Sequence, residues 1–192
     1  MKHHEIQTHP QLRGAFAGHL VSCRLSGTET DEGTNELPLF GAYEPSPAYP
    51  FGRMNPNAPP ETEQFAFMIG AFDCIDQIRQ QDGSWLEFPA MWNAYYFLNG
   101  YGIQDKYWAP TFSTSNIRIF DAKKDKWMVT FFNMPGYQSS VWEGVKEGER
   151  IVMRQGGQTT GSGLTFYNIS DNGFDWRSGD NPNWKSSCKR RR

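Results

Sequence analysis

The sequence predicts an all-β fold of antiparallel strands, either a barrel or a sandwich, over the C-terminal two-thirds of the chain. From Met68 onward, short segments of alternating polarity are separated by turn residues. Most of the aromatic residues lie in this region, in a chain whose residues are 15% aromatic. Short alternating strands joined by tight turns are typical of both architectures.

Turn signals divide this region into nine or ten expected strands. They include residues 82–83, 99–100, 135–136 and 172–173, where Asp-Gly, Asn-Gly and Pro-Gly pairs favour tight connections. The expected strands comprise residues 71–79, 85–99, 102–108, 116–121, 126–133, 139–146, 149–154, 164–170, 174–178 and 184–190. Just before them, Thr62 is a candidate cap for one helical turn that plugs an end of the barrel.

Residues 1–60 are expected to form an extension, and residues 61–192 the barrel domain. Apolar residues recur at helical spacing between positions 10 and 25, and the acidic, Gly- and Thr-rich segment 26–36 predicts a surface loop. Seven of the twelve prolines fall within residues 38–60, which predicts an extended segment. Its interspersed aromatic rings favour packing on the barrel or on a second subunit, which would give a homodimer through this extension.

Composition excludes several classes of protein. The net charge of −2 argues against a general nucleic-acid binder, and the one basic cluster, residues 189–192, is expected to be a solvated end, with a polyanion contact as the alternative. No window approaches the roughly 20 apolar residues of a membrane span, so no membrane partner is expected. Cys23, Cys74 and Cys188 lack metal-like spacing, which predicts unpaired thiols and, without a signal-peptide pattern, a cytoplasmic location.

Four motifs narrow the fold. Residues 67–74 (Phe-Met-Ile-Gly-Ala-Phe-Asp-Cys) open with a hydrophobic–Gly–x–aromatic pattern, and residues 97–105 contain a Leu-Asn-Gly-x-x-Ile step. An Arg-x-Phe-Asp strand end at residues 118–121 precedes Trp127, which opens the next expected strand. The fourth motif, residues 174–184, consists of Phe174, Trp176, Ser178, Asp180 and Trp184. Together they resemble a calycin (lipocalin-like) family of domains of unknown function, distantly similar to nitrobindin-like barrels. The resemblance covers roughly residues 65–188. It implies an up-and-down antiparallel barrel with a central cavity, and it brings no catalytic residue.

Familiar catalytic and cofactor sites find little support. All four histidines precede the barrel region, so a haem ligand on the barrel wall is not expected; haem could be held only if a helix carrying His19 entered the barrel. No Cys or His pair inside the barrel stands at zinc-ligand spacing, and no Gly-x-Ser-x-Gly motif is present. The Gly-rich segment 156–163 lacks the Lys-Ser/Thr of a phosphate loop, which favours a hairpin connection. The sequence therefore predicts no cofactor and no metal.

The leading functional hypothesis is a binding protein that holds a small, largely apolar ligand, with an aromatic or anionic group as variants. The motivation is a barrel rich in aromatic residues without catalytic histidines. The alternative is a purely structural role, in which the aromatic rings pack within and between the strands of the barrel wall while the polar residues face solvent. The candidate ligand-binding residues are the wall residues Trp92, Tyr96, Trp127, Phe131 and Trp176 and the anchors Arg118 and Arg154.

The rival hypothesis is a cofactor-independent isomerase, cyclase or hydratase that acts on an apolar metabolite in the same cavity. Such chemistry needs one or two buried acid–base groups, for which Asp105, Glu143 and Tyr107 are the candidates. A buried carboxylate beside a Tyr or an Arg would favour this hypothesis. The sequence alone leaves open which face of each strand points inward.

Overall fold

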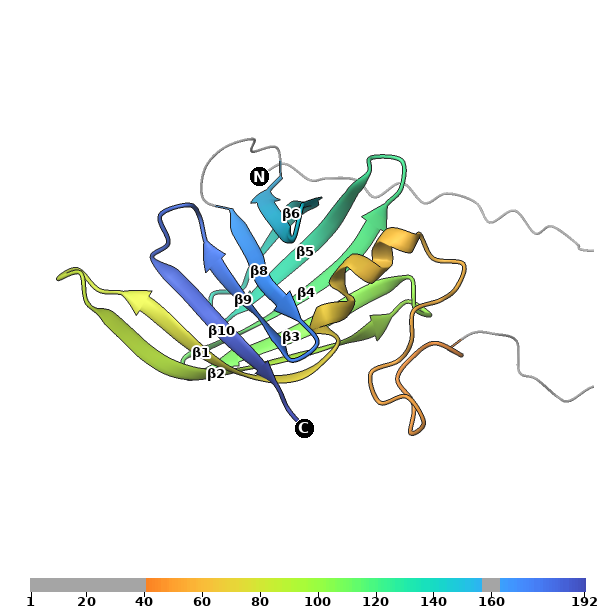
Figure 1. Cartoon of the computed structure of the whole chain (residues 1–192), viewed down its shortest axis with the longest axis horizontal. Coiled ribbons are helices and arrows are strands. Elements are labelled where there is room, and N and C mark those ends of the chain that lie inside the picture. Colours follow the sequence, from red (N-terminus) through yellow and green to blue (C-terminus); the bar gives the residue numbers. More distant parts are fainter. Residues whose placement is uncertain (1–40, 157–162) are drawn as a thin grey trace, which may run out of the picture. The chain divides into compact units, whose positions relative to one another are not determined.

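In the computed structural model, which describes residues 41–156 and 163–192, ten antiparallel strands close into one barrel (Figure 1). Each strand pairs with the next in sequence, and β1 also pairs with β10. The strands are β1 (Gly70–Arg79), β2 (Trp85–Phe97), β3 (Gly102–Ala109), β4 (Phe112–Asp121), β5 (Lys126–Met134), β6 (Gln138–Glu147), β7 (Arg150–Gln155), β8 (Leu164–Ser170), β9 (Gly173–Ser178) and β10 (Trp184–Arg190). The predicted up-and-down β-barrel is confirmed.

Strand bounds follow the predicted turns closely. The turn before β2 closes as expected, with the Gln80 N–H donating to the Ser84 carbonyl at 2.8 Å. The largest departure is β4, which begins at Phe112 instead of the predicted Asn116. Residues 113–115 are Ser-Thr-Ser, and such small polar residues show no apolar alternation that would reveal a strand.

Alternation along each strand separates a buried inner face from a more exposed outer face. On β2, Ala90, Trp92, Ala94 and Tyr96 are buried, whereas Met91, between Ala90 and Trp92, is 43% exposed. Successive side chains of a strand point to opposite faces, so each strand gives every second residue to the interior. The inner faces together form one hydrophobic cluster around the barrel axis.

One end of the barrel is closed by the 3₁₀ helix η1 (Pro60–Met68), which lies beside β4 in Figure 1. The predicted capping by Thr62 is wrong: the helix begins after Pro59, makes no side-chain cap, and buries Thr62 fully. Phe65 is fully buried, and its ring packs edge-on against Trp127 at a centroid distance of 4.7 Å. The helix therefore plugs this opening, as expected.

The described part of the Pro-rich segment, residues 41–59, lies against its own barrel. The Phe51 carbonyl accepts a hydrogen bond from the Tyr96 N–H at 2.9 Å, and the Asn55 N–H donates to the Gly100 carbonyl at 3.1 Å. Gly100 has φ +80°, and a Cβ there would lie 2.5 Å from the Arg53 carbonyl oxygen, so this contact requires glycine. The helix and loop expected within residues 10–36 lie outside the described residues.

A disulfide between Cys74 and Cys188 joins the first and last strands. The prediction of unpaired thiols is therefore wrong for these two cysteines, while Cys23 lies outside the described residues. The two residues are directly opposite each other in the β1–β10 register. They are 114 residues apart in sequence, so their spacing gives no sign of the pairing.

Replacing both Cys74 and Cys188 by Ala should lower the free energy of unfolding by about 4 kcal/mol, because the bridge closes a loop of more than 100 residues in the unfolded chain. Urea denaturation with and without dithiothreitol measures this loss. Reductant should bring the wild-type protein down to the stability of the double variant and leave the variant unchanged. A wild-type protein that is insensitive to reductant would contradict the bridge.

Candidate functional site

The barrel encloses a cavity of about 540 Å³. This volume lies within the range of small-molecule sites in proteins. The cavity extends to the end of the barrel opposite η1, where Pro135, Gly163 and Ser178 line it. Most of its wall is carbon, and its aromatic lining consists of Trp92, Tyr107, Phe112, Phe131, Trp142, Phe166, Trp176 and Trp184.

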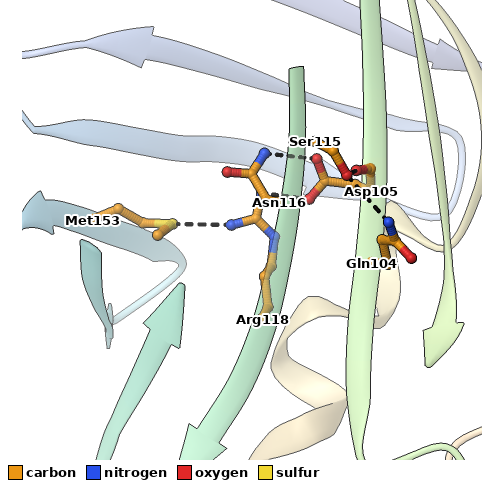
Figure 2. Close-up of polar contacts among 6 residues, drawn as sticks. All are labelled: Gln104, Asp105, Ser115, Asn116, Arg118 and Met153. Carbon is orange, nitrogen blue, oxygen red and sulfur yellow. Dashed lines mark hydrogen bonds and ion pairs between the residues drawn. The ribbon is translucent and has the colours of Figure 1, made fainter. Parts of the chain in front are cut away.

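A buried ion pair between Asp105 and Arg118 lies at the base of this cavity (Figure 2). The Arg118 Nη2 atom is 2.7 Å from Asp105 Oδ2, and the two side chains are almost completely buried. Asn116, the cross-strand partner of Asp105, donates from Nδ2 to Asp105 Oδ1 at 2.8 Å. The register of β3 against β4 thus brings all three side chains together inside the barrel.

The remaining contacts of Arg118 are weak. Its Nη1 atom donates to the Met153 sulfur at 3.4 Å, and its guanidinium lies 5.0 Å from the centre of the Phe65 ring on η1. Burial raises the pKa of Asp105, while the Arg118 guanidinium and the Asn116 amide oppose that rise by stabilising the carboxylate. The pair is therefore compensated internally: Asp105 supplies the counter-charge of Arg118.

A second buried carboxylate, Asp76 on β1, lies directly behind the cavity wall. Its Oδ2 atom accepts a hydrogen bond from the Trp184 indole N–H at 2.6 Å and another from the Tyr107 hydroxyl. Ser186, the partner of Asp76 across the β1–β10 pair, brings a neutral hydroxyl near the carboxylate, while Asp76 Oδ1 itself has no hydrogen-bond partner. Tyr107 and Trp184 both line the cavity, so their outer edges hold Asp76 while their rings form the wall.

The two carboxylates differ in their charge environment. In the described residues, no Lys or Arg nitrogen lies within ion-pair distance of Asp76, in contrast to Asp105. Burial raises the pKa of Asp76, and its neutral neighbours Ser186, Tyr107 and Trp184 oppose the rise. Burial, together with the adjacent Asp76 carboxylate, also raises the pKa of Tyr107. Asp76 is thus a buried acid that is hydrogen-bonded but has no cationic partner.

Five of the predicted site residues line the cavity: Trp92, Tyr107, Arg118, Phe131 and Trp176. Asp105 lies behind this wall as the partner of Arg118. Tyr96 and Trp127 are buried inside the barrel but do not line the cavity. Trp127 instead packs on η1, where its indole N–H donates to the Gln64 side-chain oxygen at 3.1 Å.

Glu143 and Arg154 are placed on the outer surface, which corrects their assignment to the cavity. Glu143 lies 3.0 Å from Lys126, and Arg154 lies 3.6 Å from Glu147, in both cases at partly exposed positions. Trp142 and Met153, their neighbours in sequence, line the cavity, so strand alternation turns Glu143 and Arg154 outward.

Sequence reasoning missed Asp76, Asn116, Trp142 and Phe166. A signal for Asp76 was available, since it shares a strand face with Phe72 and Cys74, both of which are buried. A charged residue on an otherwise apolar face is a candidate for a buried functional group. For Trp142 and Phe166 the choice of inward face depends on the neighbouring strands, which the sequence does not show.

Within residues 41–156 and 163–192, no three His, Cys, Asp or Glu side chains gather into a metal-binding group. The four histidines all lie outside the described residues. In the described part of the chain, no helix is long and apolar enough to cross a bilayer.

A comparison with protein-family models finds no matching family, and a comparison with curated proteins finds no match. The resemblance to the calycin family therefore stays a prediction.

Asparagine at each of the two buried carboxylates should cause unequal losses of stability. The Asp105→Asn variant leaves the Arg118 charge buried without its counter-charge and should lose about 3 kcal/mol of stability. The Asp76→Asn variant leaves no cation unpaired and should lose much less. Urea denaturation at pH 7 measures both, and equal losses would contradict the assigned charge environments.

The pH dependence of stability separates the role of Asp76 further. Because folding raises its pKa above the unfolded value, the folded state binds the proton more tightly, and wild-type stability falls as pH rises through this range. The Asp76→Asn variant lacks this contribution. Its stability relative to the wild-type protein should therefore increase from pH 4 to pH 8, and a constant difference across this range would contradict the raised pKa.

Proposed function

We propose that this barrel binds a small, largely apolar molecule in its central cavity. The supporting observation is the cavity of about 540 Å³ with an aromatic wall and one compensated ion pair at its base. An aromatic wall stabilises a bound apolar ligand because their contact removes apolar surface from water, which contributes roughly 25 cal/mol of binding free energy per Å². The resemblance to calycin barrels, which implies a central cavity, agrees with this function.

Two features of the wall bear on the polar end of the ligand. Arg118 is already neutralised by Asp105, and Arg154 lies outside the cavity, so neither offers a free charge for an anion. Asn116 also lines the cavity beside Arg118 and presents an amide that can form a neutral hydrogen bond. A ligand without a negative charge therefore fits the base of the cavity better than an anionic one.

An acid–base isomerase, cyclase or hydratase is the second candidate function. The observation that favours it is the hydrogen bond between the buried Asp76 and Tyr107, a tyrosine of the cavity wall. Such a pair can hold or move a proton at the tyrosine hydroxyl. Incorporation of deuterium from D₂O into a bound ketone, lost in both the Asp76→Asn and Tyr107→Phe variants, would support this function over binding alone.

Location and assembly stay predictions. A cytoplasmic location was expected from unpaired cysteines, and the Cys74–Cys188 bridge counts against it because disulfides persist mainly in oxidising compartments. Thiol labelling of the protein in its native cells distinguishes a cytoplasmic location from an oxidising compartment.

The homodimer expected through residues 1–60 is tested by the solution mass of the full chain and of a chain that lacks this segment.

Binding is tested with N-phenyl-1-naphthylamine, an uncharged probe that fluoresces in apolar surroundings. The wild-type protein should give a saturable increase in fluorescence with one site, and uncharged apolar competitors such as flavonoids or terpenoids should displace the probe. The Thr114→Phe variant, which fills the cavity, should weaken probe binding on the order of tenfold.

The Thr130→Phe variant is the matched control. Thr130 lies on the outer face of β5, between the inward-facing Val129 and Phe131, so the same substitution there leaves the cavity unchanged. Its probe affinity should stay within about twofold of wild type. No saturable binding in the wild-type protein, or equal loss in both variants, would count against the cavity as the binding site.

A further inference from the structure

We propose that the cavity selects a ligand bearing an organic cation, a quaternary or fully substituted ammonium group, which rests on the aromatic wall in front of Asp76. The inference rests on the proposed function and specifies the class of ligand. It follows from the charge balance inside the barrel, the ring cluster at its wall and the engagement of Arg118, the one charged residue of the wall, by Asp105.

The first observation is an unequal number of buried charges. The buried charged residues in the described part of the chain are Asp76, Asp105 and Arg118, and Arg118 is paired with Asp105. One carboxylate is therefore left without a counter-charge inside the barrel. A buried charge without a partner is costly, and a bound cation of the ligand would supply the missing positive charge.

The second observation is the set of rings in front of that carboxylate. The Tyr107 and Trp176 ring centres are 6.4 Å apart, and those of Trp176 and Trp184 are 5.4 Å apart. Trp92 and Phe112 extend the cluster on either side of Tyr107, at 5.7 and 5.8 Å. All five rings line the cavity. Aromatic clusters of this kind hold ammonium groups through the negative potential of the ring faces.

Asp76 acts on this cluster from behind. Its carboxylate accepts hydrogen bonds from the Tyr107 hydroxyl and the Trp184 indole N–H, the polar edges of two rings that line the cavity. Accepting these hydrogen bonds places negative charge at the outer edges of the rings, which makes the potential on the cavity side more favourable for a cation. A cation on the wall thus interacts with Asp76 without touching it.

The third observation is that the one charged group of the wall and one of its indole N–H groups are already engaged. The Trp142 indole N–H donates to Ser140 at 2.9 Å, and Arg118 Nη2 is held by Asp105. The buried indole N–H groups of Trp92 and Trp176 have no partner, but two neutral donors do not offset the repulsion between an anion and Asp76. An ammonium group without N–H bonds needs no acceptor, which matches a wall of ring carbon.

The test uses three compounds of one shape and different charge: benzyltrimethylammonium, its uncharged carbon isostere neopentylbenzene, and anionic phenylmethanesulfonate. Each competes with N-phenyl-1-naphthylamine for the full-length protein. The cation should bind at least about tenfold more tightly than the isostere, and the sulfonate most weakly. Equal displacement by the cation and the isostere, or stronger displacement by the sulfonate, would overturn the inference.

Two variants assign the preference to Asp76. In the Asp76→Asn variant the ratio of affinities for cation and isostere should fall close to one, and because both compounds contact the same wall, this ratio cancels any loss of affinity that they share. The control is Asp73→Asn on the same strand, since Asp73 is an exposed residue that pairs with Arg191. It should keep the wild-type ratio. A preference that survives in the Asp76→Asn variant would overturn the role of Asp76.

The wild-type protein provides a second measurement that needs no substitution. Benzyltrimethylammonium does not titrate, so its affinity should fall on acidification as Asp76 takes up a proton, while the affinity of the isostere stays constant. Three residues face Asp76: Tyr107 from β3, and Trp184 and Ser186 from β10. Of these only Tyr107 titrates, and its raised pKa lies far above the acidic pH values at which Asp76 takes up a proton. Identical pH profiles would overturn the inference, whereas loss of probe binding itself would overturn the proposed function.

Discussion

Pairing of the first strand with the last is the constraint on which the rest of the structure depends. An open sheet of ten strands would leave the backbone groups of β1 and β10 without partners at its two edges, and the antiparallel register from Phe72 to Ile78 satisfies them. Closure also defines an interior. Only in a closed barrel does every second residue of each strand face its counterparts across a common axis, so the aromatic residues of distant strands become one wall.

The two ends of this interior have different characters. At the η1 end, Phe65 and Trp127 fill the barrel with side chains, and no part of the cavity reaches them. Beyond Arg118 and Phe166 the filling stops, and the cavity continues to the opposite end. The polar groups divide in the same way: the compensated pair lies at the base, while Asp76 lies beside the aromatic wall that extends toward the opening. The plug thus closes the η1 end of the barrel, while the described lining residues of the cavity reach the opposite end.

The strands could be predicted from the sequence because their information is local. Alternation and turn residues, such as Asp82-Gly83 and Asn99-Gly100, place all ten strands to within a few residues. The choice of inward face is not local in the same way. On β6 and β7 polar and apolar residues alternate weakly, so Glu143 and Arg154 appeared as suitable as Trp142 and Met153 until the cross-strand neighbours fixed the orientation. Asp76 and the cysteine bridge depend on the β1–β10 register, which joins segments more than 100 residues apart.

The bridge between Cys74 and Cys188 has one more consequence. Together with the backbone between them, it makes a covalent circle that contains all nine chain connections between successive strands, from the β1–β2 turn through the β9–β10 turn. A protease that cuts one of these connections opens the circle without separating the two pieces. A molecule that is cut once therefore keeps all of its strands covalently joined, and the walls of the cavity can stay assembled. In a barrel without the bridge, the same cut would leave two separate fragments.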